Sequence, residues 1–389
     1  MVTLLLALIY LAFISLGLPD SLLGSAWPVM HGVLEAPLSF MGIVTMLISG
    51  CTVLSSLFSE WMTKKFTTQG TTIFSVFLTA VALFGFSYTQ NHWMLLVWAV
   101  PYGLGAGAID AALNNYVALH YNARHMSWLH CFWGAGAIIS PYVMSFALTN
   151  ATWRAGYQIV GLMQLVIGIV LLVTLPLWRV HKKSGDTQAD TPLLGVRGAF
   201  RIKGVPTILF GFFCYCAAEA TVMAWSASYL VYVRQISEET AAAMASLFYI
   251  GITFGRFAGG FITDRVGDRR MIRLGFGIIV LGVLCLMLPT KSDLPSFAGF
   301  VIIGLGCAPI YPCIIHSTPY NFGEENSQAI IGIQMAFAYT GSTLAPPVYG
   351  WLGDFVSMKI LPFFLIAFFI VMLALVEKTY HTCSQRIRN

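Results

Sequence analysis

Three acidic residues, Asp20, Asp110 and Glu219, fall inside otherwise apolar stretches of the chain. A carboxylate in the hydrocarbon of a membrane costs about 3 kcal/mol, so an acid in such a place is expected to have a function. Burial favours the neutral form of a carboxyl group, which can then take up a proton from one side of a membrane and release it to the other. We therefore predict Asp110 as the main ion-coupling acid, with Asp20 and Glu219 as further candidates. The alternative role of each acid is a hydrogen bond that packs two helices.

Asp110 belongs to a row of residues with helical spacing. Asn114 follows it by four residues, so the two side chains share one face of a helix. Gly103 and Gly107 continue this face and leave room for a neighbouring backbone or a ligand. We predict that Asn114 contacts the substrate, whereas Asn115 points about 100° away and is expected to pack.

The next apolar stretch brings His130 and Trp133 onto one helical face, because they are three residues apart. An imidazole can donate and accept hydrogen bonds. An indole ring can stack on the C–H face of a pyranose. We predict both residues as substrate contacts, with helix packing as the alternative role.

The second half of the chain offers a similar set of polar side chains. Polar aromatics and amides that face a central cavity suit a neutral, polyhydroxylated ligand. No cluster of Arg or Lys falls within the apolar stretches, and Arg256 is expected too near a helix end to bind substrate, which argues against anionic substrates. The prolines on either side of Tyr311 are expected to break its helix. The predicted substrate contacts of this half are Tyr215, Glu219, Trp225, Tyr311, Gln334 and Tyr339.

The composition defines the class of protein that must position these residues. Of 389 residues, 58% are apolar and 10% are charged, and the mean hydropathy is +0.78. A soluble domain carries about 25% charged residues, so a soluble enzyme, a nucleic-acid binder and a disordered chain are excluded. The eight cysteines are interpreted as small apolar side chains, with no disulfide. No nucleophile–base pair and no metal-ligand spacing occurs, so we expect no enzyme activity, no metal site and no cofactor.

Twelve apolar runs divide the chain into two sets of six. A spanning helix takes roughly 20 residues plus a connection, so a chain of this length accommodates about twelve. The longest polar break, 179–203, is predicted to link an N-terminal bundle (1–178) with a C-terminal bundle (204–389). The runs are 4–31, 37–58, 68–88, 93–119, 126–149 and 156–178, followed by 205–233, 240–262, 271–289, 295–319, 327–349 and 358–377.

The positions of the basic residues predict the orientation. With the N-terminus in the cytoplasm, sixteen of the 21 Lys and Arg residues fall in cytoplasmic segments and four fall on the outer side. Loops on the cytoplasmic side of a membrane carry an excess of Lys and Arg. We therefore expect both termini in the cytoplasm, which agrees with an even number of spans.

The two halves also echo each other in sequence. Gly103-Leu-Gly105 corresponds to Gly304-Leu-Gly306, and Asp20 corresponds to Glu219. Two parallel halves of six helices are the architecture of the major facilitator superfamily. The segment 255–270, GRFAGGFITDRVGDRR, resembles the signature that this superfamily carries between paired helices. The predicted gating and structural residues of this motif are Arg256, Asp264, Arg265 and Arg269.

A more specific resemblance covers two adjacent runs. The segments 101–117 (PYGLGAGAIDAALNNYV) and 127–136 (SWLHCFWGAG) resemble the fucose–galactose–glucose:proton symporter family. The resemblance implies that Asp110 and Asn114 match an acid–Asn pair of the fucose permeases, in which the acid is usually Glu. It implies that Asp20 matches a further acid, and that His130 and Trp133 occupy positions of amides in the sugar site. Because the family has proton- and sodium-coupled members, either cation is implied.

The sequence thus predicts an all-α membrane protein of twelve transmembrane helices in two pseudo-symmetric six-helix bundles. Its expected function is alternating-access transport of a monosaccharide or a similar small neutral polar solute, coupled to a cation gradient, with a proton favoured and sodium possible. The expected location is the cytoplasmic (inner) membrane, as a monomer surrounded by lipid and with no nucleic-acid partner. Two alternatives remain open: an efflux antiporter for lipophilic compounds or metabolites, and a non-transporting membrane sensor.

Overall fold

The computed structural model is helical, and the residues it describes form no strand. It describes residues 2–37, 40–179, 193–236 and 238–388. The all-α class predicted from the sequence is confirmed. The chain divides into two compact units, each described by itself below: unit 1 comprises Met1–Tyr116 and Leu129–Gly195, and unit 2 comprises Val117–Trp128 and Val196–Asn389. The bundle bounds predicted at 178 and 204 stay a prediction, and residues 180–192 of the predicted link lie outside the described residues.

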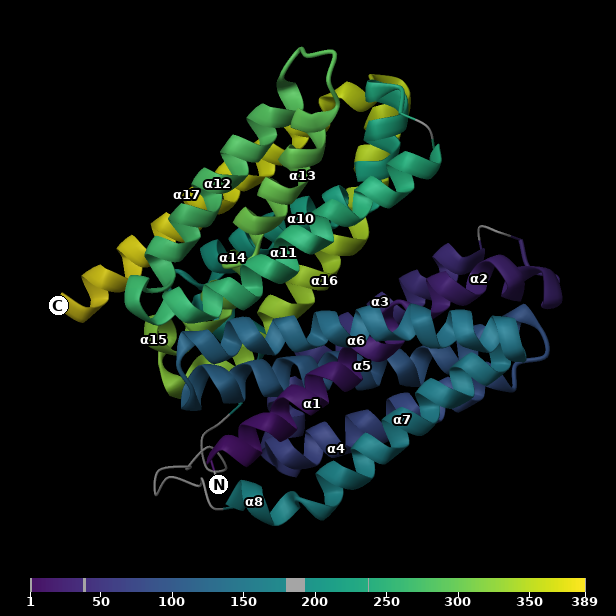
Figure 1. Cartoon of the computed structure of the whole chain (residues 1–389). Helices are drawn as coiled ribbons and strands as arrows, with labels where there is room; N and C mark the ends of the chain where they lie inside the picture. Colours follow the sequence, from purple (N-terminus) through teal and green to yellow (C-terminus); the bar gives the residue numbers. More distant parts are fainter. Residues whose placement is uncertain (1, 38–39, 180–192, 237, 389) are drawn as a thin grey trace. The chain divides into compact units, whose positions relative to one another are not determined.

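Unit 1 is built from the helices of the first half of the chain (Figure 1). The first apolar run forms two helices rather than one, because the helix is interrupted at Ser21, just after Pro19. Asp20 is therefore the last residue of its helix. The helices are α1 (Val2–Asp20), α2 (Leu22–Val33), α3 (Phe40–Leu57), α4 (Ser59–Ser87), α5 (His92–His120), α6 (Ala123–Asn150), α7 (Trp153–Val173) and α8 (Leu175–Arg179).

Unit 2 contains the helices of the second half. The break predicted near Tyr311 lies at Ala308-Pro309, between α13 and α14. By contrast, α16 continues through Pro346 and Pro347. The elements are α9 (Gly195–Arg201), α10 (Val205–Arg234), α11 (Glu238–Val266), α12 (Asp268–Met287), α13 (Leu294–Cys307), α14 (Ile310–His316), α15 (Thr318–Phe322), α16 (Glu324–Phe355), the short 3-10 helix η2 (Met358–Ile360) and α17 (Leu361–Arg388).

Ten helical segments among the described residues are long and apolar enough to cross a membrane. They coincide with ten of the twelve predicted runs. The other two runs, 240–262 and 327–349, correspond to α11 and α16, which are 29 and 32 residues long but carry more polar and charged residues. The count of twelve spans stays a prediction.

The glycine face of α5 is used for helix packing. A Cβ atom added at Gly107 would meet the carbonyl oxygen of Thr52, and one added at Gly103 would meet that of Ile48. Both oxygens belong to α3. Of the two uses predicted for this face, a neighbouring backbone and a ligand, the structure has the backbone. Small residues allow such close approach between helices in membranes.

This contact gives a first prediction, for the Gly107→Ala variant. The added methyl group must displace the backbone of α3, so we expect the melting temperature of the purified protein to fall by several degrees. Gly50→Ala is the matched control, because Gly50 lies on α3 itself and a Cβ there meets nothing within 4 Å. Alanine is preferred to glycine inside a helix by about 0.5–1 kcal/mol, so the control should be neutral or stabilising. Equal melting temperatures for the two variants would contradict the close packing of α3 on α5.

The described end of the predicted link is held by Glu60 of α4. Its carboxylate accepts hydrogen bonds from the backbone N–H groups of Leu194 and Gly195, at 2.9 and 3.1 Å. It also forms an ion pair with Lys64 at 3.1 Å. The segment after the masked part of the link is thus fixed to unit 1 at the point where α9 begins.

Candidate functional site

Asp110, Asn114 and His130 form a buried chain of hydrogen bonds in unit 1. The amide nitrogen of Asn114 donates to Oδ1 of Asp110 at 2.7 Å and to the backbone oxygen of Asp110 at 3.0 Å. Nε2 of His130 lies 3.2 Å from Oδ1 of Asn114. The exposed fractions of the three residues are 4%, 0% and 6%. Three residues selected from spacing alone are thus in direct contact.

The direction of donors in this chain follows from its two ends. The carboxylate and the backbone oxygen of Asp110 can only accept, so the nitrogen of the Asn114 amide must face them. The oxygen of Asn114 then faces His130 and needs a donor, which places a proton on Nε2 of His130. The edge of the His130 ring is also fixed by Phe13 of α1, whose centroid lies 5.5 Å away at a right angle. The donors therefore point toward the Asp110 carboxylate.

Asp20 is the acceptor of a second polar group in unit 1. The hydroxyl of Tyr102 donates to its Oδ1 at 3.0 Å, and the indole nitrogen of Trp133 donates to its Oδ2 at 2.8 Å. Asp20 is exposed and Trp133 is half-buried. Because Asp20 ends α1 at the break before α2, its carboxylate reaches a surface that a carboxylate inside a continuous helix would not reach.

Helix α6 connects the two polar groups. His130 contacts the group of Asp110, and Trp133, three residues later on the same helix, contacts Asp20. Only 22% of the apolar window of α6 is buried within the chain. One helix with a largely uncovered surface thus carries a side chain in contact with each acidic group, and a solute on that surface could meet both Trp133 and water-accessible Asp20.

In unit 2, Glu219 of α10 forms a buried ion pair with Arg256 of α11. Nη2 of Arg256 lies 3.2 Å from Oε1 of Glu219, and the two residues are 6% and 8% exposed. This changes the interpretation of Arg256, which was expected near a helix end. Helix α11 continues to Val266, so Arg256 lies ten residues before the end of its helix.

The other predicted residues of unit 2 have varied contacts. Tyr215 is fully buried and donates to the backbone oxygen of Cys307 at 2.9 Å. Its ring lies 6.3 Å from that of Tyr311, whose hydroxyl contacts the sulfur of Met335. Trp225 donates to the backbone oxygen of Pro346 at 2.8 Å.

Gln334 and Tyr339 of α16 differ in burial. Gln334 is fully buried, and its oxygen accepts a hydrogen bond from the hydroxyl of Thr318 at 3.0 Å. Tyr339 is half-buried, one turn before Thr343, which bonds to its backbone oxygen. Glu219, Tyr215 and Gln334 are buried and bound to other residues of unit 2, whereas Tyr339 retains an accessible surface.

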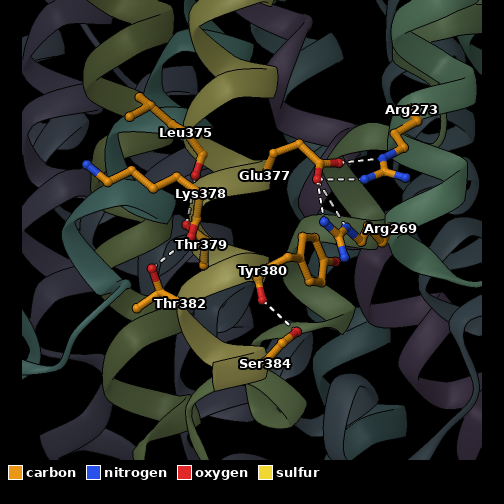
Figure 2. Close-up of polar contacts among 9 residues, drawn as sticks. All are labelled: Arg269, Arg273, Leu375, Glu377, Lys378, Thr379, Tyr380, Thr382 and Ser384. Atoms are coloured by element: carbon orange, nitrogen blue, oxygen red, sulfur yellow. Dashed lines mark hydrogen bonds and ion pairs between the residues drawn. The ribbon is translucent and has the colours of Figure 1, made fainter. Parts of the chain in front are cut away.

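The motif at the end of α11 makes contacts within unit 2. The carboxylate of Asp264 accepts from the backbone N–H of Arg124 at 3.0 Å and pairs with its side chain. Arg265 is exposed. Arg269 donates to Glu377 of α17 at 2.6 Å, and Arg273 donates to the same carboxylate (Figure 2). The motif therefore ties α11 and α12 to their neighbours, as a structural role requires.

Sequence reasoning missed several polar residues with buried contacts. Tyr102, the partner of Asp20, lies in a segment that was singled out but was not itself selected. His316, which lies 2.7 Å from Asp268, was not considered among the histidines. Gln164 was detectable as an amide in the middle of the run 156–178. The part of the chain that the structure describes contains no group of three or more His, Cys, Asp or Glu side chains that could hold a metal ion.

Comparisons with known proteins match nearly the whole chain to one family. The model of the Major Facilitator Superfamily matches residues 9–290 and 208–381. The glucose/mannose transporter GlcP of Bacillus subtilis is 22% identical over 302 residues, which cover 76% of this chain and 74% of that protein.

Solved structures show the same fold at low sequence identity. The E. coli fucose:proton symporter FucP aligns with a TM-score of 0.78 and 16% identity, over 97% of this chain and 98% of that one. The proton:xylose symporter XylE aligns with a TM-score of 0.75 and 11% identity, over 96% of this chain and 94% of that one.

Proposed function

Because the chain belongs to the major facilitator superfamily, a family of transporters rather than enzymes, we propose that it carries a monosaccharide or a similar small neutral polar solute. The transport would proceed by alternating access and be driven by a cation gradient, with a proton favoured and sodium possible. The chain is a multi-pass membrane protein. The cytoplasmic membrane, cytoplasmic termini and a monomeric state are parts of the proposal.

The observation that carries the proposal is the buried contact of Asp110 with Asn114 and His130. A carboxylate in this place gives a cation a binding site, and the amide and imidazole next to it are groups that bind sugar hydroxyls. When a cation neutralises Asp110, the carboxylate becomes a weaker acceptor for Asn114. The amide is then freer to bind a solute hydroxyl, so cation binding would favour solute binding.

The names of similar proteins support a sugar as the solute. GlcP is described as a glucose/mannose transporter, FucP as a fucose:proton symporter and XylE as a proton:xylose symporter. The accessible indole of Trp133 beside Asp20 supports the same class of ligand. The ring offers an apolar face for the C–H groups of a pyranose, and the carboxylate offers an acceptor for its hydroxyl groups.

Coupling requires that the cation and the solute favour different states of the carrier to different extents. A ligand shifts a conformational equilibrium only by its differential affinity for the two states. We propose that Asp110 is the main coupling acid, with Asp20 assisting it. Asn114, His130 and Trp133 of unit 1 would bind the solute. Glu219, Tyr215, Trp225, Tyr311, Gln334 and Tyr339 of unit 2 remain proposed contacts.

The test of substrate class is a thermal-shift screen of the purified protein against a panel of sugars. The screen is repeated at neutral and acidic pH, and in sodium or potassium chloride. We expect at least one neutral sugar to raise the melting temperature, and the salt and pH conditions to identify the cation. Stabilisation by organic anions or lipophilic drugs, with none by any sugar, would overturn the proposed substrate class.

A pair of neighbouring asparagines tests the site itself. Asn114→Ala should weaken binding of the sugar found in the screen about tenfold, since one hydrogen bond contributes roughly 1 kcal/mol and its polar neighbours lose a partner. Asn115→Ala is the matched control, because this residue is also buried but lies about 100° away on α5. Isothermal titration gives both dissociation constants. An equal loss in the two variants would point to a general packing defect rather than to contact with the sugar.

A further inference from the structure

A small cavity lies inside unit 1, between α1, α4, α5 and α7. Its lining includes Ser15 and Pro19 of α1, Ser75 of α4, Tyr102 of α5 and Gln164 of α7. It offers about 10 Å³ for water, which is close to the space that one molecule needs. None of the residues proposed to bind the cation or the solute lines it.

Three polar atoms of this lining lack a hydrogen-bond partner among the described residues. They are the hydroxyl oxygens of Ser15 and Ser75 and the side-chain oxygen Oε1 of Gln164. The residues are 0%, 0% and 1% exposed. A buried polar group without a partner costs about 1–3 kcal/mol. Three such atoms from three helices at one cavity therefore indicate a bound molecule that satisfies them together.

The orientation of the Gln164 amide is fixed by its other end. Its nitrogen lies 2.9 Å from the backbone oxygen of Ser15 and 3.0 Å from the hydroxyl of Thr79. A flipped amide would place Oε1 against the backbone oxygen of Ser15, and two acceptors cannot bond to each other. Oε1 is therefore an acceptor that needs a donor, and no donor of the described chain reaches it.

We propose that one buried water molecule occupies this cavity and joins α1, α4 and α7. It donates a proton to Oε1 of Gln164 and accepts one from each hydroxyl, of Ser15 and of Ser75. This arrangement satisfies all three atoms with about the number of hydrogen bonds that a buried water makes. A sodium ion would bind the same oxygens, but the protons of both hydroxyls would then have to turn away from it. The count of protons therefore favours water.

The position of the water gives it a structural role in the candidate site. Tyr102, which lines the cavity, holds Asp20 by a hydrogen bond, and Pro19, the neighbour of Asp20, lines it too. The water thus supports the end of α1 from behind, at the point where the helix breaks. Its loss should weaken the packing of unit 1 without removing a group that contacts the solute.

The first test is an experimental structure at a resolution that shows ordered water. We expect one peak within hydrogen-bond distance, about 2.7–3.2 Å, of all three atoms. An empty cavity at that resolution, or a peak at the shorter distances of a coordinated cation, would overturn the proposal. This test needs no variant, so it holds even where a substitution prevents folding.

The second test compares the thermal unfolding of Ser75→Ala and Ser226→Ala. Both hydroxyls are buried and lack a partner, but Ser226 belongs to unit 2 and does not line this cavity. With water present, Ser75→Ala removes a hydrogen bond and should lower the melting temperature by about 2 °C more than Ser226→Ala does. If the cavity is dry, removing the hydroxyl of Ser75 should be neutral or stabilising, and the proposal fails.

The same variant separates water from a cation. With water bound, replacing sodium chloride by potassium chloride should leave the effect of Ser75→Ala on the melting temperature unchanged. A stabilisation by sodium that persists in Asp110→Asn and disappears in Ser75→Ala would assign a sodium ion to the cavity and overturn the proposal. Because Asp110 does not line the cavity, this outcome is distinct from a failure of the proposed coupling site.

Discussion

We expect the Asp110→Asn variant to lose accumulation of its solute against a gradient while it keeps exchange across the membrane. The amide cannot gain or lose a proton and is a poor site for a cation, so the carrier resembles one whose acid is permanently neutralised. Both states of the carrier then interconvert without the cation. Transport becomes equilibrative, and the solute concentration inside should approach that outside.

The local structure allows this substitution without a packing defect. Asn114 donates both to Oδ1 of Asp110 and to its backbone oxygen. An asparagine at position 110 retains both acceptors and has nearly the same shape. The expected loss therefore arises from the missing charge and not from a change of fold.

The measurement uses proteoliposomes loaded with the solute that the screen identifies. Uptake driven by an imposed gradient is compared with counterflow of labelled solute in the absence of a gradient. Asp110→Glu is the control, since it keeps the carboxyl group and matches the acid that is usual in the resembled family. Gradient-driven accumulation by Asp110→Asn at the level of the unmodified protein would exclude Asp110 as the coupling acid.

The sequence was sufficient for those parts of the site that depend on position along one helix. The fourfold spacing of Asp110 and Asn114, and the glycines on the same face, follow from helical geometry, and the structure places them together. The contact with His130 needed one further step, the antiparallel neighbour along the chain. Short-range order within one helix thus carried the prediction of this group.

Contacts between distant helices could not be derived in this way. The bond between Tyr102 and Asp20 joins residues 82 positions apart, and the bonds of Gln164 join α7 to α1 and α4. Nothing in the local pattern of either helix specifies its partner, because these pairs depend on how whole helices pack. The cavity beside Gln164 is a product of the same packing and has no signature in the sequence.

The position of Arg256 was misjudged for a physical reason. Hydropathy ends an apolar run at the first group of charges, here Asp264 and Arg265. The helix itself ends later, since backbone hydrogen bonds continue through charged residues up to Val266 and Gly267 interrupts them. An arginine that hydropathy places near an end can therefore lie well inside the helix, provided that an acid such as Glu219 neutralises it.

The second large effect is expected from this buried pair. Glu219→Gln should lower the free energy of unfolding by about 3–5 kcal/mol, because it leaves the charge of Arg256 without compensation in a buried place. Nε of Arg256 already lacks a partner among the described residues, so no other group nearby takes over. The double variant Glu219→Leu with Arg256→Met should recover most of the loss, since a buried ion pair replaced by apolar side chains is often neutral in stability.

Thermal unfolding and the yield of purified protein measure this effect. Asp293→Asn is the matched control, because Asp293 pairs with Arg234 at 3.3 Å but is 41% exposed in its side chain. Breaking an exposed pair should change stability by less than about 1 kcal/mol. If Glu219→Gln is instead as stable as the unmodified protein, the charge of Glu219 is not needed to balance Arg256. The acid would then be free to bind and release a cation, and Glu219 would become the stronger candidate for coupling in unit 2.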